Sequence, residues 1–174
     1  MKKFILFIYL ILISFVFSEM KIGWVNTQKI LAEYDDVNKV YTETEKEKNR
    51  LELVYQAKQT KIDSLMSDYQ QKQLLMSEEK VKQMENEIIT LQQELQLFIQ
   101  NMNSPQGELA QFFNNLMAPI EERIYNAIQK VSIEKEYDYV IDCSTGMCLY
   151  QKEEYNLTGL VQDQLKKMAI DSEE

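Results

Sequence analysis

Apolar residues recur at spacings of three and four along much of the chain, which is the spacing of one face of an α-helix. The more regular run alternates the two spacings without exception and comprises Val81, Met84, Ile88, Leu91, Leu95, Phe98 and Met102. A second run precedes it, has Lys58 and Lys72 in two of its slots, and comprises Leu51, Tyr55, Ile62, Leu65, Tyr69 and Met76. The pattern predicts two long helices, each with a heptad seam.

The segment between the two seams carries signals for a reversal and a new helix. Ser77 is followed by Glu78 and Glu79, which suits the N-terminus of a helix. Two seams joined by a tight reversal predict an antiparallel helical hairpin, with arms of about 35–40 residues that extend roughly 50–60 Å. In the returning arm, the stretch from Ser104 to Gly107 contains Pro105 and should interrupt the helix, and Pro119 should bend it again.

The two ends of the chain have a different pattern, rich in β-forming residues. Residues 20–25 indicate a short strand, with Asn26 or Thr27 capping a helix that starts near Gln28. Residues 137–142 and 148–151 indicate two more strands joined by a turn, and Thr158 is expected to cap a last helix. A small sheet should join the ends, with a set of apolar residues in its core or at a subunit interface: Ile22, Trp24, Tyr139, Ile141 and Leu149.

The first 18 residues have the composition of a signal peptide. Met1-Lys2-Lys3 is followed by an apolar run to Phe17, and Val16 and Ser18 are small enough to precede a cleavage site after Ser18. The alternative is a retained membrane anchor, for which the run is short, because a bilayer span needs about 20 apolar residues. No cysteine follows the run to take a lipid. The segment therefore predicts export, which in a bacterium means the periplasm.

Charge and residue usage argue against several classes of partner and of catalytic or metal site. Cleavage after Ser18 leaves 17 basic against 28 acidic residues, a formal charge of −11, which argues against a nucleic-acid partner. The chain has no histidine, and no phosphate loop, zinc pattern or nucleophile elbow is present in it. We therefore expect no enzyme activity, no cofactor and no metal site. Cys143 and Cys148 have four residues between them, so they suit either a cross-strand disulfide or two buried thiols.

Three stretches of sequence, in the order of these elements, carry a family resemblance. They are KIGWVN at 21–26, LMAPIEERIYNAIQKV at 116–131, and YDYVID at 137–142 with Leu149-Tyr150 and Leu157-Thr158 after it. Together they span nearly all of the mature chain. The chain thereby resembles the Skp/OmpH family of periplasmic chaperones.

The resemblance implies an α+β, mostly α fold: a small barrel-like trimerisation body carrying a long coiled-coil hairpin. It implies a signal peptide at 1–18, a body from 19–37 and 132–174, and an arm at 38–131. It further implies a homotrimer that holds unfolded outer-membrane proteins in a cavity between the arms without ATP. The best-known members are basic and this chain is acidic, which argues against direct binding of membranes or lipopolysaccharide. The alternative from another class is a structural coiled-coil spacer or adaptor of the cell envelope.

Residues 88–120 form the stretch best suited to contact a client. Glu94 and Glu108 are its only charged residues; the others are mostly polar uncharged residues mixed with Ile, Leu, Phe and Met, which offer broad or adaptable contacts. The alternative is that its large apolar side chains pack the hairpin or the trimer junction. The candidates for client contact are Phe98, Met102, Phe112, Phe113 and Met117.

Overall fold

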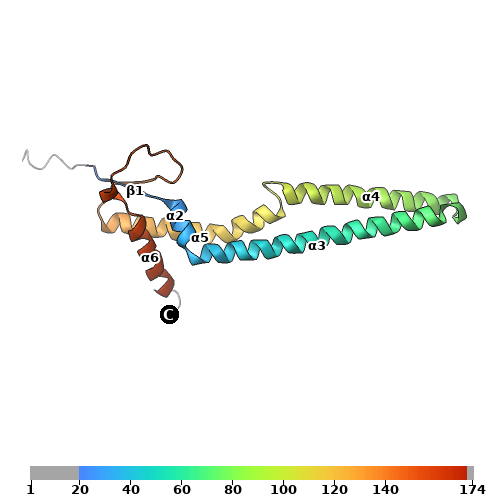
Figure 1. Cartoon of the computed structure of the whole chain (residues 1–174), viewed down its shortest axis with the longest axis horizontal. Helices are drawn as coiled ribbons and strands as arrows, with labels where there is room; N and C mark the ends of the chain where they lie inside the picture. The colour runs from blue at the N-terminus through green and yellow to red at the C-terminus, as the bar shows by residue number, and fades with distance from the viewer. Residues whose placement is uncertain (1–19, 172–174) are drawn as a thin grey trace, which may run out of the picture. The chain divides into compact units, whose positions relative to one another are not determined.

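The computed structural model describes residues 20–171, so the predicted signal peptide lies outside the described residues. The fold is mostly helical, with one two-stranded sheet among the described residues (Figure 1). In chain order the elements are β1 (Ile22–Val25), α2 (Thr27–Glu33), α3 (Asp35–Lys72), the 3-10 helix η1 (Gln73–Leu75), α4 (Glu78–Asn103), α5 (Glu108–Glu134), β2 (Tyr139–Asp142), the 3-10 helix η2 (Glu153–Tyr155) and α6 (Thr158–Asp171).

The chain divides into two compact units. The hairpin is Asp35–Glu121, and the body contains the residues up to Tyr34 and from Glu122 onward. Helix α5 contributes residues to both units. The predicted boundaries of the arm, 38 and 131, place its start three residues later and its end ten residues later than this division does.

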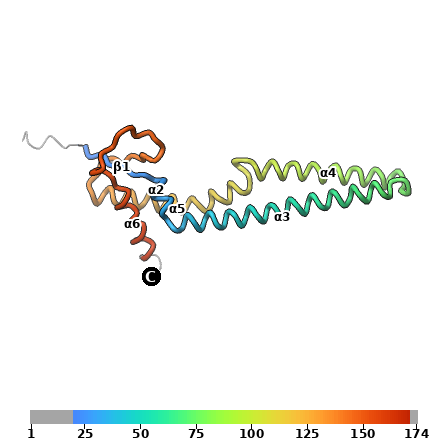
Figure 2. Tube along the Cα trace, in the orientation of Figure 1, coloured from blue at the N-terminus to red at the C-terminus, as the bar shows by residue number. Residues whose placement is uncertain are grey.

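In the hairpin, α3 and α4 lie side by side and run in opposite directions (Figures 1 and 2). The predicted seams pack between them: Leu51 and Ile62 of α3 are 1% and 3% exposed, and Ile88 and Leu95 of α4 are also buried. Ser77 caps α4, since its side chain accepts a hydrogen bond from the Lys80 N–H. The two-seam hairpin expected from the pattern is therefore confirmed.

The returning arm is interrupted where the sequence predicted. Helix α4 ends at Asn103 and α5 begins at Glu108, with Pro105 and Gly107 in the connection. The backbone at Gly107 passes so close to the end of α4 that a Cβ built there would lie 1.7 Å from the carbonyl oxygen of Asn101. Any other residue would force this turn open. Pro119, in contrast, lies inside α5, which continues past it as one helix.

The two strands of the body pair in parallel, with Ile22 opposite Tyr139 and Trp24 opposite Ile141. One face of the sheet is covered by the chain itself. A Cβ at Gly23, on that face, would lie 2.9 Å from the Leu157 side chain, so the absence of a side chain there permits close packing.

The third strand predicted at 148–151 is wrong. These residues form no strand, and Leu149 and Tyr150 are 99% and 81% exposed. The backbone on the free side of β1 is used by a later segment: Trp24 forms a parallel bridge with Asn156, and the Leu157 N–H donates to the Trp24 carbonyl at 2.8 Å. After the loop closed by the Cys143–Cys148 disulfide, the chain runs to the β1 edge of the sheet instead of pairing with β2.

Helix caps explain where the helices of the body begin. Asn26 caps α2 by accepting from the Lys29 N–H at 2.9 Å, as expected. Tyr34 is extended and ends α2, a break that the sequence analysis did not predict. The predicted cap at Thr158 is wrong, because its hydroxyl accepts from the Asn26 N–H at 3.0 Å instead. Thr158 thus joins the start of α6 to the end of β1.

None of the helices within residues 20–171 combines the length and the apolar character needed to cross a membrane.

Candidate functional site

The apolar residues predicted for the sheet lie on one face of it. Partners in a parallel pair point to the same side, so Ile22, Trp24, Tyr139 and Ile141 share the face opposite Gly23. Ile22, Tyr139 and Ile141 are 44%, 60% and 47% exposed, and Trp24 is half-buried, with its indole Nε1 donating to the Lys152 carbonyl at 2.8 Å. Within one chain these residues and Leu149, which is 99% exposed, do not form a buried core. The subunit-interface interpretation stays a prediction.

Cys143 and Cys148 are joined by a disulfide, with Cα atoms 5.2 Å apart. The bond closes a loop that leaves β2 rather than a hairpin of two strands. At the start of this loop the Asp142 carboxylate accepts hydrogen bonds from Thr27 and Ser144. Burial raises the pKa of Asp142, but these hydrogen bonds outweigh burial and hold it below its ordinary value. No cluster of metal-binding side chains is found among residues 20–171.

The five predicted client-contact residues are less accessible than expected. Met117 is only 7% exposed, and that leaves little of its side chain for a client. Phe98, Met102, Phe112 and Phe113 are half-buried. The Phe113 ring lies 5.8 Å from that of Tyr41 in α3, which shows part of its surface in use between helices. A client role for these four residues stays a prediction.

More exposed apolar side chains lie at hairpin positions that the sequence analysis did not select. Leu53, Ile89 and Leu97 are 66%, 51% and 65% exposed. Leu74 and Leu75, at the reversal, are 93% and 88% exposed. The first three are apolar residues one or two positions away from a seam residue, where helical geometry turns them outward. That offset is a sequence signal that makes them candidates for exposure.

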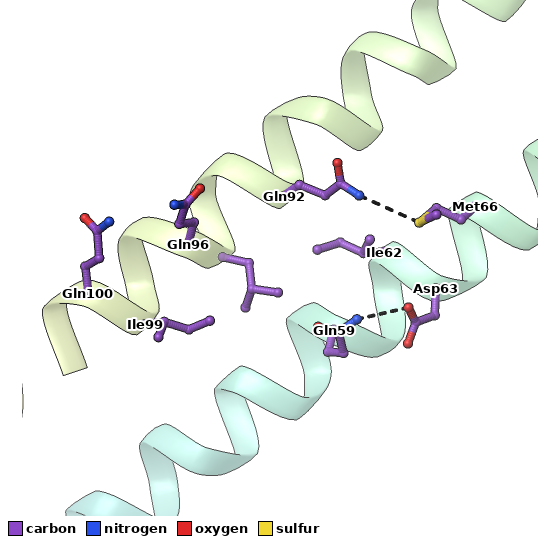
Figure 3. Close-up of a pocket in the computed structure, with 9 residues that line it drawn as sticks. Gln59, Ile62, Asp63, Met66, Gln92, Gln96, Ile99 and Gln100 are labelled. Carbon is purple, nitrogen blue, oxygen red and sulfur yellow. Dashed lines mark hydrogen bonds between the residues drawn. The ribbon is translucent and has the colours of Figure 1, made fainter. Parts of the chain in front are cut away.

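A groove of about 460 Å³ lies between α3 and α4 (Figure 3). Ile62 and Leu95 form its apolar floor, and Ile99 extends that floor along α4. Its rim is rich in glutamine: Gln59, Gln92, Gln96 and Gln100. A smaller depression of about 350 Å³ adjoins it and is lined by Gln93, Gln96, Leu97 and Gln100.

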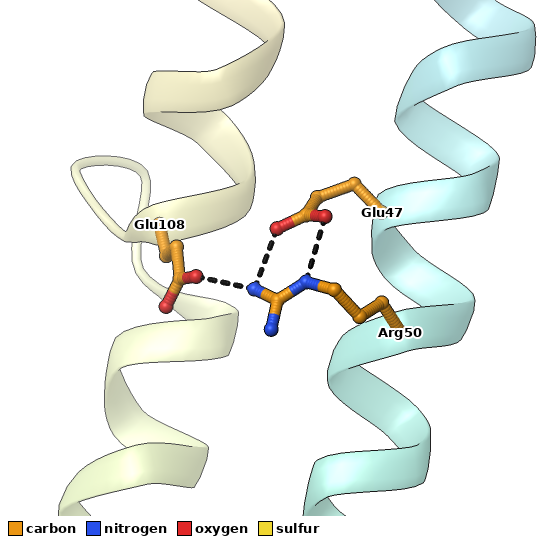
Figure 4. Close-up of polar contacts among 3 residues, drawn as sticks. All are labelled: Glu47, Arg50 and Glu108. Carbon is orange, nitrogen blue, oxygen red and sulfur yellow. Dashed lines mark hydrogen bonds and ion pairs between the residues drawn. The ribbon is translucent and has the colours of Figure 1, made fainter.

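Both charged residues of the stretch 88–120 have basic partners on α3. The Glu108 carboxylate lies 2.6 Å from Arg50, which also donates two hydrogen bonds to Glu47 (Figure 4). These bonds lower the pKa of Glu47 and raise that of Arg50. Glu94 lies 3.7 Å from the ammonium of Lys58. Such exposed pairs add little stability, but they give both carboxylates of the stretch 88–120 a basic partner.

Comparison with known proteins relates this chain to one protein family and to a solved structure. A family model described as "Outer membrane protein (OmpH-like)" matches residues 21–165. The crystal structure of a Caulobacter crescentus CB15 protein assigned as an outer membrane chaperone (OmpH-like) superposes with a TM-score of 0.70 at 10% identity, over 87% of this chain and 86% of that chain. At that identity the likeness concerns the fold. A search of curated proteins finds no match. Because the family model covers most of its length, the chain belongs to the OmpH-like outer membrane protein family.

Proposed function

We propose that this protein is an ATP-independent chaperone that holds unfolded outer-membrane proteins in the periplasm. Membership of the OmpH-like family supports a chaperone function in general. The observation that carries the proposal is the exposure of separate apolar side chains along both helices of the hairpin, at Leu53, Ile89 and Leu97, each surrounded by polar or charged side chains.

The dispersal of these side chains suits a holding function. A large continuous apolar patch would drive the chaperone to aggregate with itself. Separate apolar positions offer many weak contacts instead. Together these contacts retain an unfolded chain, and each of them is weak enough to break when the client leaves. No nucleotide or catalytic step enters this account, because the contacts themselves supply the binding free energy.

The proposal includes a homotrimer assembled through the body. A two-stranded sheet is marginal by itself in water, and the face that carries Ile22, Tyr139 and Ile141 is open in one chain. Strand β2 pairs only with β1 among the described residues, so its outer edge has free backbone groups. Further strands from other copies would cover the face and complete a barrel-like body, leaving the hairpins to enclose the client.

The proposed location in the periplasm rests on the predicted signal peptide and agrees with the Cys143–Cys148 disulfide, since such bonds persist in oxidising compartments. The acidic charge of the mature chain favours protein clients over anionic lipid surfaces.

The test is suppression of aggregation of a urea-unfolded outer-membrane barrel after dilution. The variant Leu53→Gln, Ile89→Gln, Leu97→Gln removes the exposed apolar groups of the hairpin at positions where substitution should cost little stability. The matched control, Met20→Gln, Ile133→Gln, Ile170→Gln, changes three equally exposed apolar residues of the body. We expect the hairpin variant to lose most of its protection and the control to keep it. Equal protection by both variants would contradict the proposed surface.

A further inference from the structure

Three glutamines lie at intervals of four residues on the side of α4 that borders the groove: Gln92, Gln96 and Gln100. At about 100° per residue, they fall within roughly 80° of arc, so they form one continuous ridge. Figure 3 shows them one after another along α4, with Ile62 and Ile99 between the two helices. All three side chains are exposed to solvent. We call this set the glutamine ridge.

Most of the hydrogen-bonding capacity of the ridge is unused. Within the part of the chain that the structure describes, the side chains of Gln96 and Gln100 have no hydrogen-bond partner. Gln92 makes only a weak contact, from Nε2 to the Met66 sulfur at 3.8 Å. Each of these amides has two N–H donors and a carbonyl acceptor, so it can pair with both groups of a peptide unit.

The spacing of the ridge matches the repeat of an extended polypeptide. Four residues of an α-helix rise about 6 Å. In an extended strand, backbone groups that face the same edge recur every two residues, or about 6.6–6.8 Å. Over the two intervals of the ridge the accumulated difference is about 1.5 Å, which flexible glutamine side chains can absorb. Three successive amides can therefore meet three successive peptide groups on one edge of a strand.

The two flanks of the ridge accommodate the side chains of such a strand. When a strand lies with its edge against the ridge, alternate side chains point to opposite flanks. On one flank is the groove with its floor of Ile62, Leu95 and Ile99. On the other flank is the smaller depression beside Leu97. Because the apolar floor of the groove receives the side chains of one face of the strand, the ridge favours a segment in which at least every second residue is apolar.

The charges around the ridge suit an uncharged backbone. Glu94 is next to Lys58, and Asp63 accepts a hydrogen bond from Gln59 at 3.0 Å. The ridge itself presents amide dipoles without net charge, and these complement the peptide dipoles of a strand better than they complement an ionised side chain.

We propose that the glutamine ridge binds the backbone edge of an extended, unfolded polypeptide segment, whose alternate apolar side chains enter the groove beside Ile62, Leu95 and Ile99. The inference rests on the proposed holding function and names the feature of the client that is recognised. Because the backbone is common to all sequences, one ridge serves many clients, while the alternation selects segments that form amphipathic strands.

The test is a double-mutant cycle between the ridge and a peptide backbone. The variant Gln92→Met, Gln96→Met, Gln100→Met keeps side-chain length and helix propensity but removes the amides. The probe is a lysine-flanked peptide that alternates valine and threonine, compared with the same peptide N-methylated along its backbone, by fluorescence anisotropy. The matched control, Gln56→Met, Gln70→Met, Gln83→Met, changes exposed glutamines of the same hairpin that line neither depression. Circular dichroism and light-scattering mass verify that each variant folds and assembles.

We expect N-methylation of the peptide to weaken its binding to the wild type and to the control variant about tenfold. Its binding to the ridge variant should weaken no more than about twofold, because the two to three net hydrogen bonds can be lost only where the ridge is intact. An equal effect of N-methylation on wild type and ridge variant would overturn the inference. So would a wild-type chain that holds an unfolded barrel but does not bind the peptide; the holding function would then stand without the ridge. A wild-type chain that holds neither would contradict the proposed function itself.

Discussion

Loss of the Cys143–Cys148 disulfide should lower the stability of the body by about 2 kcal/mol. The two cysteines are five residues apart, so the bond closes a short loop. For a loop of that length, chain entropy in the unfolded state accounts for roughly 7 cal/mol/K, or about 2 kcal/mol at 25 °C. With a typical urea dependence for a small domain, the unfolding midpoint should fall by roughly 1 M.

Trp24 is a suitable reporter for this experiment. It is the only tryptophan of the chain, it lies in β1, and its indole donates to the Lys152 carbonyl in the segment that follows the disulfide loop. Urea unfolding followed by its fluorescence, with and without a dithiol reductant and at fixed protein concentration, measures the effect. Fixed concentration is needed because self-association would shift the midpoint.

The double variant Cys143→Ser, Cys148→Ser should match the reduced wild type and be insensitive to the reductant. Thr145→Ser, in the same loop with both cysteines kept, should behave as the wild type. Midpoints that agree with and without reductant in the wild type would refute the reasoning, since the loop would then constrain nothing in the unfolded chain.

Three further predictions follow from the packing and the charges. Leu51→Ala should lower the free energy of unfolding by about 2–4 kcal/mol, because the Leu51 side chain is only 1% exposed. Leu53→Ala should lower it by less than about 0.5 kcal/mol, because the Leu53 side chain is 66% exposed; denaturant unfolding of both variants measures the difference. Gly107→Ala should lower the thermal unfolding midpoint, because the new Cβ would meet the Asn101 carbonyl. Gly159→Ala, in open space within α6, should raise the midpoint slightly. Equal midpoints for the two variants would contradict the prediction for Gly107. The pKa of Asp142 is lowered in the folded state, so its contribution to stability is present above its ordinary value of 3.8 and is lost as the pH falls through the lower folded value. Asp142→Asn should remove that part of the acid dependence of unfolding, and an unchanged acid limb would count against it.

The hairpin could be predicted from the sequence because its determinants are local and periodic. The unbroken alternation from Val81 to Met102 fixes one face of a helix, and Ser77 and Pro105 mark its limits. Asn26 was found as a cap by the same local chemistry. The break at Tyr34 also had a local signal, since Asp35 and Asp36 provide the acidic first turn of a new helix, but the apolar spacing across it hid the interruption.

The arrangement of the body could not be predicted in the same way, because it depends on contacts between distant residues. Residues 148–151 have the β propensity of a strand, but they do not pair with β2, and the chain bonds to the sheet only later, where Asn156 and Leu157 meet Trp24 of β1. Thr158 has the residue type of a cap, yet its hydroxyl serves Asn26, which is 132 residues away. Tertiary position overrides propensity in both cases.

The sequence identified the region of the candidate surface but not the exposed apolar residues within it. Low charge identified the stretch 88–120, whereas the choice of large side chains selected Met117, which is buried, and Phe112, which is half-buried. Leu97 is exposed because it stands beside the seam, and only the rotation of α4 against α3 decides which neighbours of a seam are covered.

The central claim, that this protein holds unfolded outer-membrane proteins, is tested most directly by light-scattering mass. The mature chain is measured alone and after dilution of a urea-unfolded outer-membrane barrel into it. The account predicts a trimer alone and a soluble complex of defined mass containing one barrel chain. A chain that keeps its mass while the barrel aggregates would contradict the holding function and favour a structural role in the cell envelope.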